Sequence, residues 1–375
     1  MNVRHPNYLQ RHQRGFSLVE ILVGIAIGMV GLLVIFKTVS IWDSHTRTTV
    51  AGGDAQVAGT LAMFNLERDI KLAGMGFGEA PAPVMGCSVV GTVNFPLYPV
   101  QIIPGVPAGA SDSIKVLAGN SSFFVSGQPF TSSSATTKTV NAIGRAGFRR
   151  GDLVVVAGNE TALPASATCA LVQITDNVEG APIVHAAGSY VPDPAYSAAS
   201  SAASVFNSST GTGSTFTSGT MYNLGPSPQS NLWQVTNGRV LSRTDAIHAT
   251  AAFEVAEGVI SVKAQYGVDA NGDNIIADSE WVTTTPTDWT LVRAIRVALL
   301  VRSSQFEKPA STSAAAAIAV TTTAPSWFGG SFLMTNVDGT PDSETTDVPN
   351  NWRYYRYTVY EKVIPLRNMI WGTAP

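Results

Sequence analysis

Residues 14–36 read RGFSLVEILVGIAIGMVGLLVIF, the only segment of this 375-residue chain that is long and apolar enough to span a membrane. The 21 residues from Phe16 to Phe36 would extend about 31 Å as a helix, close to the roughly 30 Å of hydrocarbon in a bilayer. Glu20 is the single charge among them. A carboxylate deep in a membrane costs roughly 2.5–3.5 kcal/mol, so such a residue indicates a function. The alternative interpretation is that Glu20 lies near the membrane surface and reaches water.

The residues before this segment are basic. Arg4, Arg11 and Arg14 precede it, with no acidic residue, which favours a cytoplasmic N-terminus. A secretory signal peptide would be cleaved after the apolar run, where KTVSIWDSHTRTTVAGG is a weak match. A better junction precedes the run, at RGFSLVE.

This junction resembles the class III leader of type IV pilins and type II secretion pseudopilins. The resemblance implies that a prepilin peptidase cuts after Gly15 and methylates the new N-terminus at Phe16. It also implies an assembly role for Glu20, whose carboxylate would pair with the N-terminal ammonium of a neighbouring subunit inside an apolar filament core. Pairing offsets the desolvation of both charges and fixes the axial register.

A second helical pattern follows in residues 54–78, DAQVAGTLAMFNLERDIKLAGMGFG. Five residues recur at helical spacing, Val57, Leu61, Phe64, Arg68 and Leu72, and among them Leu61 and Phe64 predict an apolar stripe. The glycines at 74, 76 and 78 predict the end of the helix. Gly52-Gly53 is a candidate weak point. The phrase LERDIKLAGMGFG resembles the same helix end in PilW-type minor pilins, which implies one long spine helix packed on a globular head.

Beyond residue 80, short strand-like runs replace the helical pattern. Asn237-Gly238 between LWQV and RVLS predicts a two-residue hairpin. Two tracts rich in Ser, Thr, Ala and Gly, near 194–220 and 309–325, indicate flexible surface insertions. The expected strands are 113–117, 152–157, 168–174, 232–235, 239–242, 259–266, 291–302 and 354–363. The last third of the chain contains, in order, GVISVKAQYGVDANGD, WTLVRAIRVALLVRS and RYTVYEKVIPLRN. This order resembles that of PilW-type proteins, which implies that residues 258–370 form the sheet of the head.

These patterns, with the resemblance, predict an α+β, type IV pilin-like fold: a long N-terminal spine helix packed on a mainly antiparallel β head with long loop insertions. The expected parts are a cleaved leader (1–15), a transmembrane and filament-core helix (16–37), a periplasmic continuation of that helix (38–78) and the head (79–375).

Cys87 and Cys169 are the only cysteines in the chain. An even pair in an oxidising periplasm predicts one disulfide. Two free buried thiols are the alternative.

Residues 269–280, DANGDNIIADSE, fit a calcium-binding loop of the EF-hand type. Asp269, Asn271 and Asp273 supply oxygen ligands at positions 1, 3 and 5, the carbonyl of Ile275 serves position 7, and Glu280 fills position 12. Asn274 replaces the usual glycine at position 6, and a strand-like segment precedes the loop. A solvated hairpin loop without metal explains the same residues, so calcium is the one candidate cofactor.

Composition argues against catalysis and against nucleic-acid binding. Charged residues make up 13% of the chain and the net charge is −3, so there is no basic field for nucleic acid. The sequence contains no HExxH, CxxC, GxSxG or Walker motif, which makes an enzyme a distant alternative. The basic and aromatic stretch WRYYRYTVYEKVIPLR alternates like a sheet strand and is interpreted as structural.

The resemblance implies a minor pilin that helps initiate type IV pilus assembly and is incorporated into the pilus at or near its tip. The implied partners are other minor pilins, the major pilin, the prepilin peptidase and the inner-membrane assembly platform. The chain would sit in the inner membrane with its head in the periplasm, and later in the pilus at the cell surface. The alternatives are a minor pseudopilin of a type II secretion system and a pilus-borne adhesin.

Overall fold

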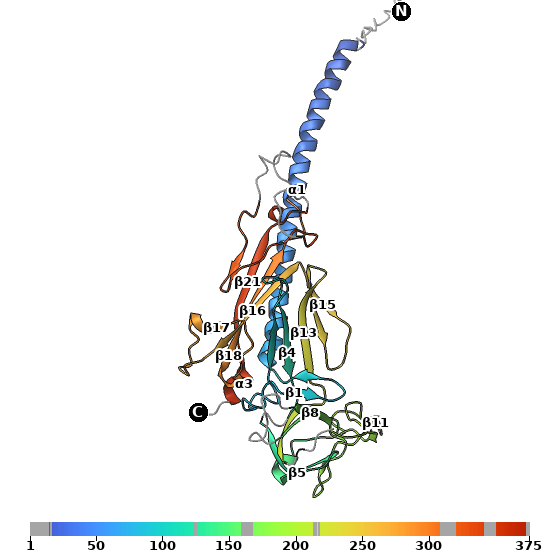
Figure 1. Ribbon diagram of the computed structural model, residues 1–375. Coiled ribbons are helices and arrows are strands. Elements are labelled where there is room, and N and C mark those ends of the chain that lie inside the picture. Colours follow the sequence, from blue (N-terminus) through green and yellow to red (C-terminus); the bar gives the residue numbers. More distant parts are fainter. Residues whose placement is uncertain are drawn as a thin grey trace, which may run out of the picture. The chain divides into compact units, whose positions relative to one another are not determined.

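The computed structural model describes residue 15 and residues 17–122, 126–158, 168–212, 216, 218–307, 320–340 and 350–372. The chain forms two compact units, Met1–Ala51 and Gly52–Pro375. The long helix α1 (Leu18–Leu72) contributes to both units (Figure 1). It passes through Gly52 and Gly53 as a regular helix, so the expected weak point does not interrupt it.

In the first unit, α1 presents one candidate membrane span, Leu18–Asp43, with a mean hydropathy of 2.7 and no buried residue. In the second unit, α1 ends at Leu72 and is followed by turns at Gly74 and Gly76, both with positive φ. Glycine adopts this conformation without a steric penalty, which is why it terminates helices. The N–H of Gly74 donates to the carbonyl of Leu117 and so joins the helix end to a strand.

The face of α1 that packs in the second unit is not the stripe expected from the sequence. Ala62, Leu66 and Ile70 are fully buried, whereas Val57 and Phe64 are 70% and 59% exposed. The physical reason is close approach: a Cβ at Gly59 would overlap the ring of Tyr360. Small residues therefore select the packed face, and α1 carries a second, exposed apolar face.

A four-stranded antiparallel sheet packs against α1, in the order β17-β16-β18-β21. The hydroxyl of Tyr360 on β21 donates to the carbonyl of Gln56 at 3.0 Å, and Lys362 Nζ lies 2.7 Å from Glu67 Oε2. The strands are β16 (Val259–Val268), β17 (Trp281–Val282), β18 (Val292–Arg302) and β21 (Tyr357–Pro365).

A second antiparallel sheet has five strands in the order β15-β14-β13-β4-β3. Its hairpin β13–β14 turns at Asn237 and Gly238, which have φ of 51° and 68°, as the Asn-Gly pair predicts. The strands are β3 (Val100–Ile103), β4 (Ser113–Ala118), β13 (Gln229–Thr236), β14 (Val240–Asp245) and β15 (Phe253–Glu257).

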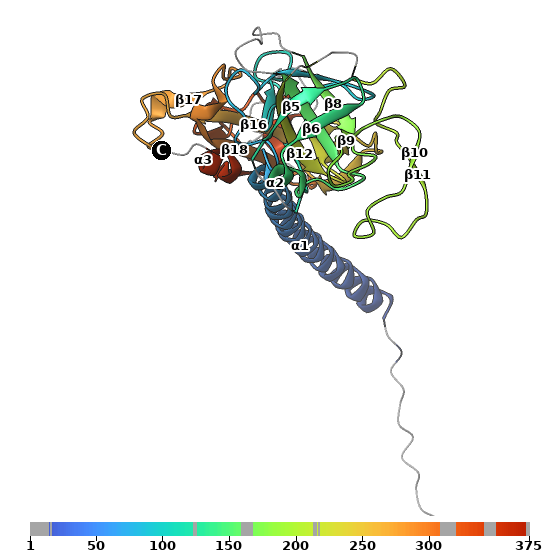
Figure 2. The same cartoon turned by 90° about the horizontal axis from the view of Figure 1, so that it is seen from below.

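A third sheet has eight strands in the order β2-β1-β8-β7-β12-β5-β6-β9 (Figure 2). Its pairs are antiparallel except β1 with β8, which is parallel. The strands are β1 (Ser88–Val90), β2 (Phe95–Pro96), β5 (Gln128–Ser133), β6 (Thr137–Val140), β7 (Leu153–Gly158), β8 (Thr168–Gln173), β9 (Ile183–Val184) and β12 (Gly219–Gly225).

Short elements complete the described chain. Two strand pairs stand apart from the three sheets, β10 (Ser189–Tyr190) with β11 (Ala202–Ala203) and β19 (Ser326–Trp327) with β20 (Gly330–Ser331). The short helices are α2 (Ala142–Arg145), η2 (Asp278–Glu280), η3 (Trp289–Leu291), η4 (Trp352–Tyr354) and α3 (Arg367–Gly372). The expected 309–325 insertion lies outside the described residues up to 319.

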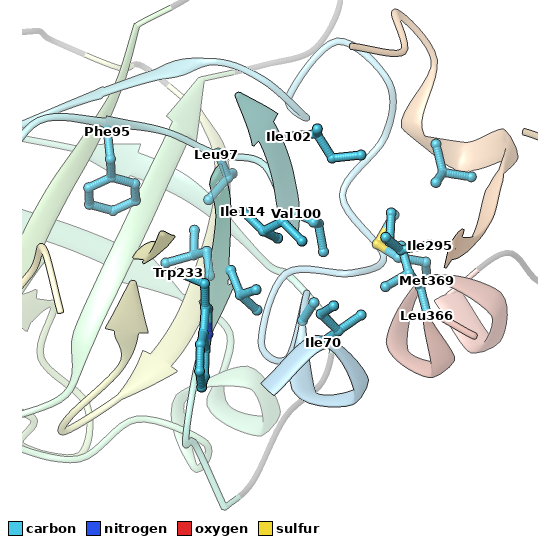
Figure 3. Packing of buried hydrophobic residues seen from close by; sticks show 14 of the residues in the cluster. Ile70, Phe95, Leu97, Val100, Ile102, Ile114, Trp233, Ile295, Leu366 and Met369 are labelled. Atoms are coloured by element: carbon cyan, nitrogen blue, oxygen red, sulfur yellow. The ribbon is translucent and has the colours of Figure 1, made fainter. Parts of the chain in front are cut away.

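One large hydrophobic core joins α1 to all three sheets (Figure 3). Ile70 from α1, Trp233 from β13 and Ile295 from β18 are fully or almost fully buried in it. The outer face of the eight-stranded sheet has a separate cluster around Phe130 and Val154. The architecture confirms the predicted α+β fold, with a helix packed on mostly antiparallel sheets.

Candidate functional sites

The predicted cleavage junction lies directly before α1. Gly15 is exposed, and Phe16 lies outside the described residues. The Oγ of Ser17 accepts the backbone N–H of Glu20 at 3.3 Å and so caps the first turn of α1. The structure therefore places Glu20 in the first turn of the helix, where a negative charge is favoured by the helix dipole.

The segment Leu18–Asp43 exposes nearly all of its apolar side chains in the first unit. Ile21 is 52% exposed and Phe36 is 70% exposed. A contiguous exposed apolar surface of this length marks a membrane or protein contact. Among residues 18–36 the only charged side chain is that of Glu20.

The exposed apolar stripe of α1 in the second unit consists of Val57, Leu61 and Phe64. With Gln56 and Thr60 these residues line a shallow groove of about 550 Å³. Leu61 is 48% exposed, so the stripe presents several apolar side chains on one helix face. Apolar stripes on helices are typical surfaces for packing a second helix.

Asp69 links α1 to the five-stranded sheet. Its Oδ2 accepts Asn231 Nδ2 at 2.8 Å and Trp233 Nε1 at 3.0 Å, and Arg243 Nη1 lies 4.0 Å away. Asp69 is only 5% exposed, and a buried carboxylate needs such donors because burial removes its hydration. This contact positions the helix; nothing in it suggests chemistry on a substrate.

Cys87 and Cys169 form a disulfide with an S–S distance of 2.02 Å and a Cα–Cα distance of 5.9 Å. Both cysteines are buried in the large core. Cys169 lies in β8 and Cys87 directly precedes β1, so the bond is next to the parallel strand pair. The disulfide covalently links the residue before β1 to strand β8 of the eight-stranded sheet.

The predicted calcium loop joins β16 to β17. Asp269 is fully buried, while Asn271, Asp273 and Ile275 are exposed. The carboxylate of Glu280 accepts two backbone N–H groups of the loop, from Ala270 at 3.1 Å and Ala277 at 2.9 Å. Within the described parts of the chain, no three His, Cys, Asp or Glu side chains gather in a metal-ligating arrangement.

One buried polar pair has no counterpart among the residues singled out in the sequence. Lys138 on β6 is fully buried, and its Nζ lies 3.0 Å from Nε2 of His185, which is 1% exposed. Nζ also donates to the carbonyls of Ser134 and Thr137. Burial lowers the pKa of Lys138 to about 8 and that of His185 to about 3. No local signal predicts the pair, because its members are 47 residues apart.

Comparison with known proteins identifies two regions of the chain. Residues 220–368 match the family described as Type IV Pilus-assembly protein W. Residues 10–36 match the prokaryotic N-terminal methylation motif. No curated protein and no solved structure gives a significant match.

The two matched regions correspond to the two parts of the molecule that carry the predicted pilin features. The methylation motif covers the junction at Gly15, the residue Glu20 and most of the apolar segment. The other match runs from β12 to α3 and includes the four-stranded sheet that packs on α1. The two matches together support a PilW-type pilin with a class III prepilin leader.

Proposed function

We propose that this chain is a minor pilin that helps to initiate type IV pilus assembly and is incorporated at or near the pilus tip. The observation that carries the proposal is the apolar segment Leu18–Asp43, none of which is buried, directly after a leader junction. In this proposal, residues 1–15 are removed, Phe16 is methylated, and residues 16–37 form the membrane anchor and later the filament core. Residues 38–78 continue the helix in the periplasm, and residues 79–375 form the head.

Glu20 is the assembly residue in this proposal. It is the sole charge among residues 16–36, so leaving it unpaired inside a filament core would be costly. The N-terminal ammonium created by cleavage at Gly15 is a partner of opposite charge. Pairing between subunits would therefore favour one axial register over others.

The exposed stripe of Val57, Leu61 and Phe64 supports incorporation into a filament. These side chains lie on the helix face turned away from the core of the head. Packing the stripe against another pilin would remove apolar area from water, at roughly 25 cal/mol per Å². Val57→Ser with Phe64→Ser should therefore reduce incorporation without affecting cleavage of the leader.

The tip position is supported by the size of the head. Its eight-stranded sheet lies mostly outside the matched region, which begins within β12. A head enlarged in this way would crowd a uniform shaft but would fit at an end. Partners in this proposal are other minor pilins, the major pilin, the prepilin peptidase and the assembly platform, and the head is periplasmic before assembly.

The first experiment is intact-mass analysis of the protein from cells with and without the prepilin peptidase. A mature chain beginning at methylated Phe16, only where the peptidase is present, is the expected result. A chain that retains Met1 in both strains, or begins near residue 50, would refute the leader.

The second experiment separates processing from assembly. Glu20→Ala should be cleaved normally yet be lost from sheared pili, whereas Asp43→Ala, a carboxylate removed later on the same helix, should be incorporated as in wild type.

Immunogold labelling should place the wild-type protein at pilus ends; even labelling along the shaft would contradict the tip position. Loss of secretion with normal pili would favour a pseudopilin, and normal piliation with loss of surface binding would favour an adhesin.

A further inference from the structure

The loop 269–280 has both of its ends fixed by the four-stranded sheet. β16 leads into it and β17 leaves it, and the two strands pair through Tyr266 with Val282 and Gly267 with Trp281. The first residue, Asp269, is held in place by its N–H bond to the carbonyl of Leu291 at 2.9 Å. The loop is thus a closed twelve-residue connection on a rigid base.

The backbone of the loop follows the pattern of a twelve-residue calcium loop. Asn274, at its sixth position, has a φ of 63°, the left-handed conformation that glycine usually supplies there. Its N–H donates to Asp269 Oδ2 at 3.1 Å. A helical turn, η2, begins at the tenth position and places Glu280 at the twelfth.

An independent observation points to a cation: Asp269 is fully buried, and its Oδ1 accepts no hydrogen bond from the part of the chain that the structure describes. Its other oxygen, Oδ2, accepts from the loop N–H of Asn274 and lies 3.5 Å from Arg293 Nε. The carboxylate therefore has one buried oxygen, Oδ1, without a hydrogen-bond donor, although its charge is paired with Arg293 through Oδ2. A buried carboxylate oxygen is stabilised by a donor or by a metal ion.

We propose that residues 269–280 bind one Ca²⁺ ion. Oδ1 of Asp269, the side-chain oxygens of Asn271 and Asp273, the carbonyl of Ile275 and both carboxylate oxygens of Glu280 form the ligand set. Binding requires the loop to tighten, because Glu280 now accepts the N–H groups of Ala270 and Ala277. The ion replaces those two hydrogen bonds and draws the exposed side chains toward the buried one.

The chemistry of the ligands selects calcium and sets a weak affinity. Six or more oxygens with a bidentate glutamate suit Ca²⁺, whereas Mg²⁺ demands a rigid octahedron and keeps its waters. The guanidinium of Arg293 beside Asp269 opposes a second positive charge. We therefore expect a dissociation constant in the range of extracellular modules, about 10⁻⁴–10⁻³ M.

Trp281 provides a fluorescent reporter of metal binding, because it directly follows Glu280. The centroid of its ring lies 4.6 Å from the guanidinium carbon of Arg296. Binding would fix this residue at the sheet edge. Tb³⁺, which replaces Ca²⁺ in oxygen sites, should therefore emit on tryptophan excitation when bound to the full-length protein in detergent micelles. Ca²⁺ should displace it in the range above, and Mg²⁺ at the same concentration should not.

Three variants test the ligand set without disturbing the buried Asp269. Asp273→Asn and Glu280→Gln should each weaken Tb³⁺ and Ca²⁺ binding at least tenfold, with an unchanged circular dichroism spectrum. Asp278→Asn removes a carboxylate from the same loop at a non-ligand position and should bind as wild type.

Two results would overturn the proposal. One is the absence of both Tb³⁺ emission and heat of Ca²⁺ binding by wild-type protein at 10 mM ion, a concentration about tenfold above the expected constant. The other is an equal loss in Asp278→Asn and Glu280→Gln, which would indicate a diffuse charge effect. The pilus assignment is unaffected by either result.

Discussion

The contact between Asp69 and the five-stranded sheet makes a quantitative prediction for the change Asp69→Ala. The substitution removes the acceptor of two buried donors, Trp233 Nε1 and Asn231 Nδ2. Asn231 keeps a second acceptor, Gln229 Oε1 at 3.3 Å, so Trp233 is the donor left without a partner. The indole is 1% exposed and water cannot reach it without rearrangement of the core.

The magnitude follows from these two bonds. Hydrogen bonds to a charged group contribute about 1.5–3 kcal/mol each, and a buried donor left unpaired carries a desolvation cost of about 1–3 kcal/mol. Allowing for the acceptor that Asn231 keeps, we expect Asp69→Ala to lower the free energy of unfolding by about 3–5 kcal/mol. The loss should fall mainly on the docking of α1, because Asp69 is the helix residue in this contact.

Urea unfolding of the full-length protein in micelles, followed by tryptophan fluorescence, measures this loss. Glu257→Ala is the matched control, because it removes a carboxylate from an exposed ion pair with Arg239 and should cost at most about 1 kcal/mol. Trp233→Phe, made alone and together with Asp69→Ala, completes a double-mutant cycle. Equal losses for the Asp69 and Glu257 variants, or a coupling energy near zero, would refute the assigned bond.

Three further predictions follow. Gly59→Ala should destabilise the wild type but stabilise a Tyr360→Ala background by up to about 1 kcal/mol, since alanine is the better helix former once the ring is absent. Removing the disulfide with Cys87→Ala and Cys169→Ala should cost at most about 4–5 kcal/mol in thermal or urea unfolding, from the entropy of a long closed loop. Acidification from pH 7 to 5 should cost about 2 kcal/mol through His185.

The direction in which pH changes the stability through His185 follows from the lowered pKa of this residue. Below about pH 6.5, His185 becomes protonated in the unfolded chain, whereas in the folded protein it stays neutral down to about pH 3. The free energy of unfolding therefore falls as the pH falls through that window. His185→Gln keeps an acceptor for Lys138 and should flatten this part of the profile. Burial raises the pKa of Asp152, whose contribution has the opposite sign, so the difference between variant and wild type is the decisive quantity.

Features encoded in short windows were predictable from the sequence. The apolar run after Gly15 needs only its length and composition, and the Asn237-Gly238 turn needs only two residues with positive φ. Expected strands such as 113–117 and 259–266 coincide with β4 and β16 within about two residues. Each was predictable because apolar residues there repeat with the period of the element.

Features that depend on distant partners were not predictable. β5 and β6 lie in a run rich in Ser and Thr and lack an apolar pattern, yet they pair, with Ser132 Oγ donating to Thr139 Oγ1 at 2.8 Å. The buried face of α1 depends on a ring contributed by β21, about 300 residues later. The expected ligands are contiguous in sequence, but Asp269 also contacts the carbonyl of Leu291 and the guanidinium of Arg293, which lie more than 20 residues later.

The two hydrophobic clusters explain how the eight-stranded sheet, which lies mostly outside the matched region, stays packed against the rest of the head. β7 is buried on both faces: Leu153 and Val155 belong to the core shared with α1, whereas Val154 and Val156 belong to the outer cluster. The inner face therefore shares its apolar contacts with the helix, and the disulfide fixes one end of the sheet. Substitutions that deplete the outer cluster should consequently alter the outer surface of the head while the docking of α1 is retained, because only the inner cluster includes helix residues.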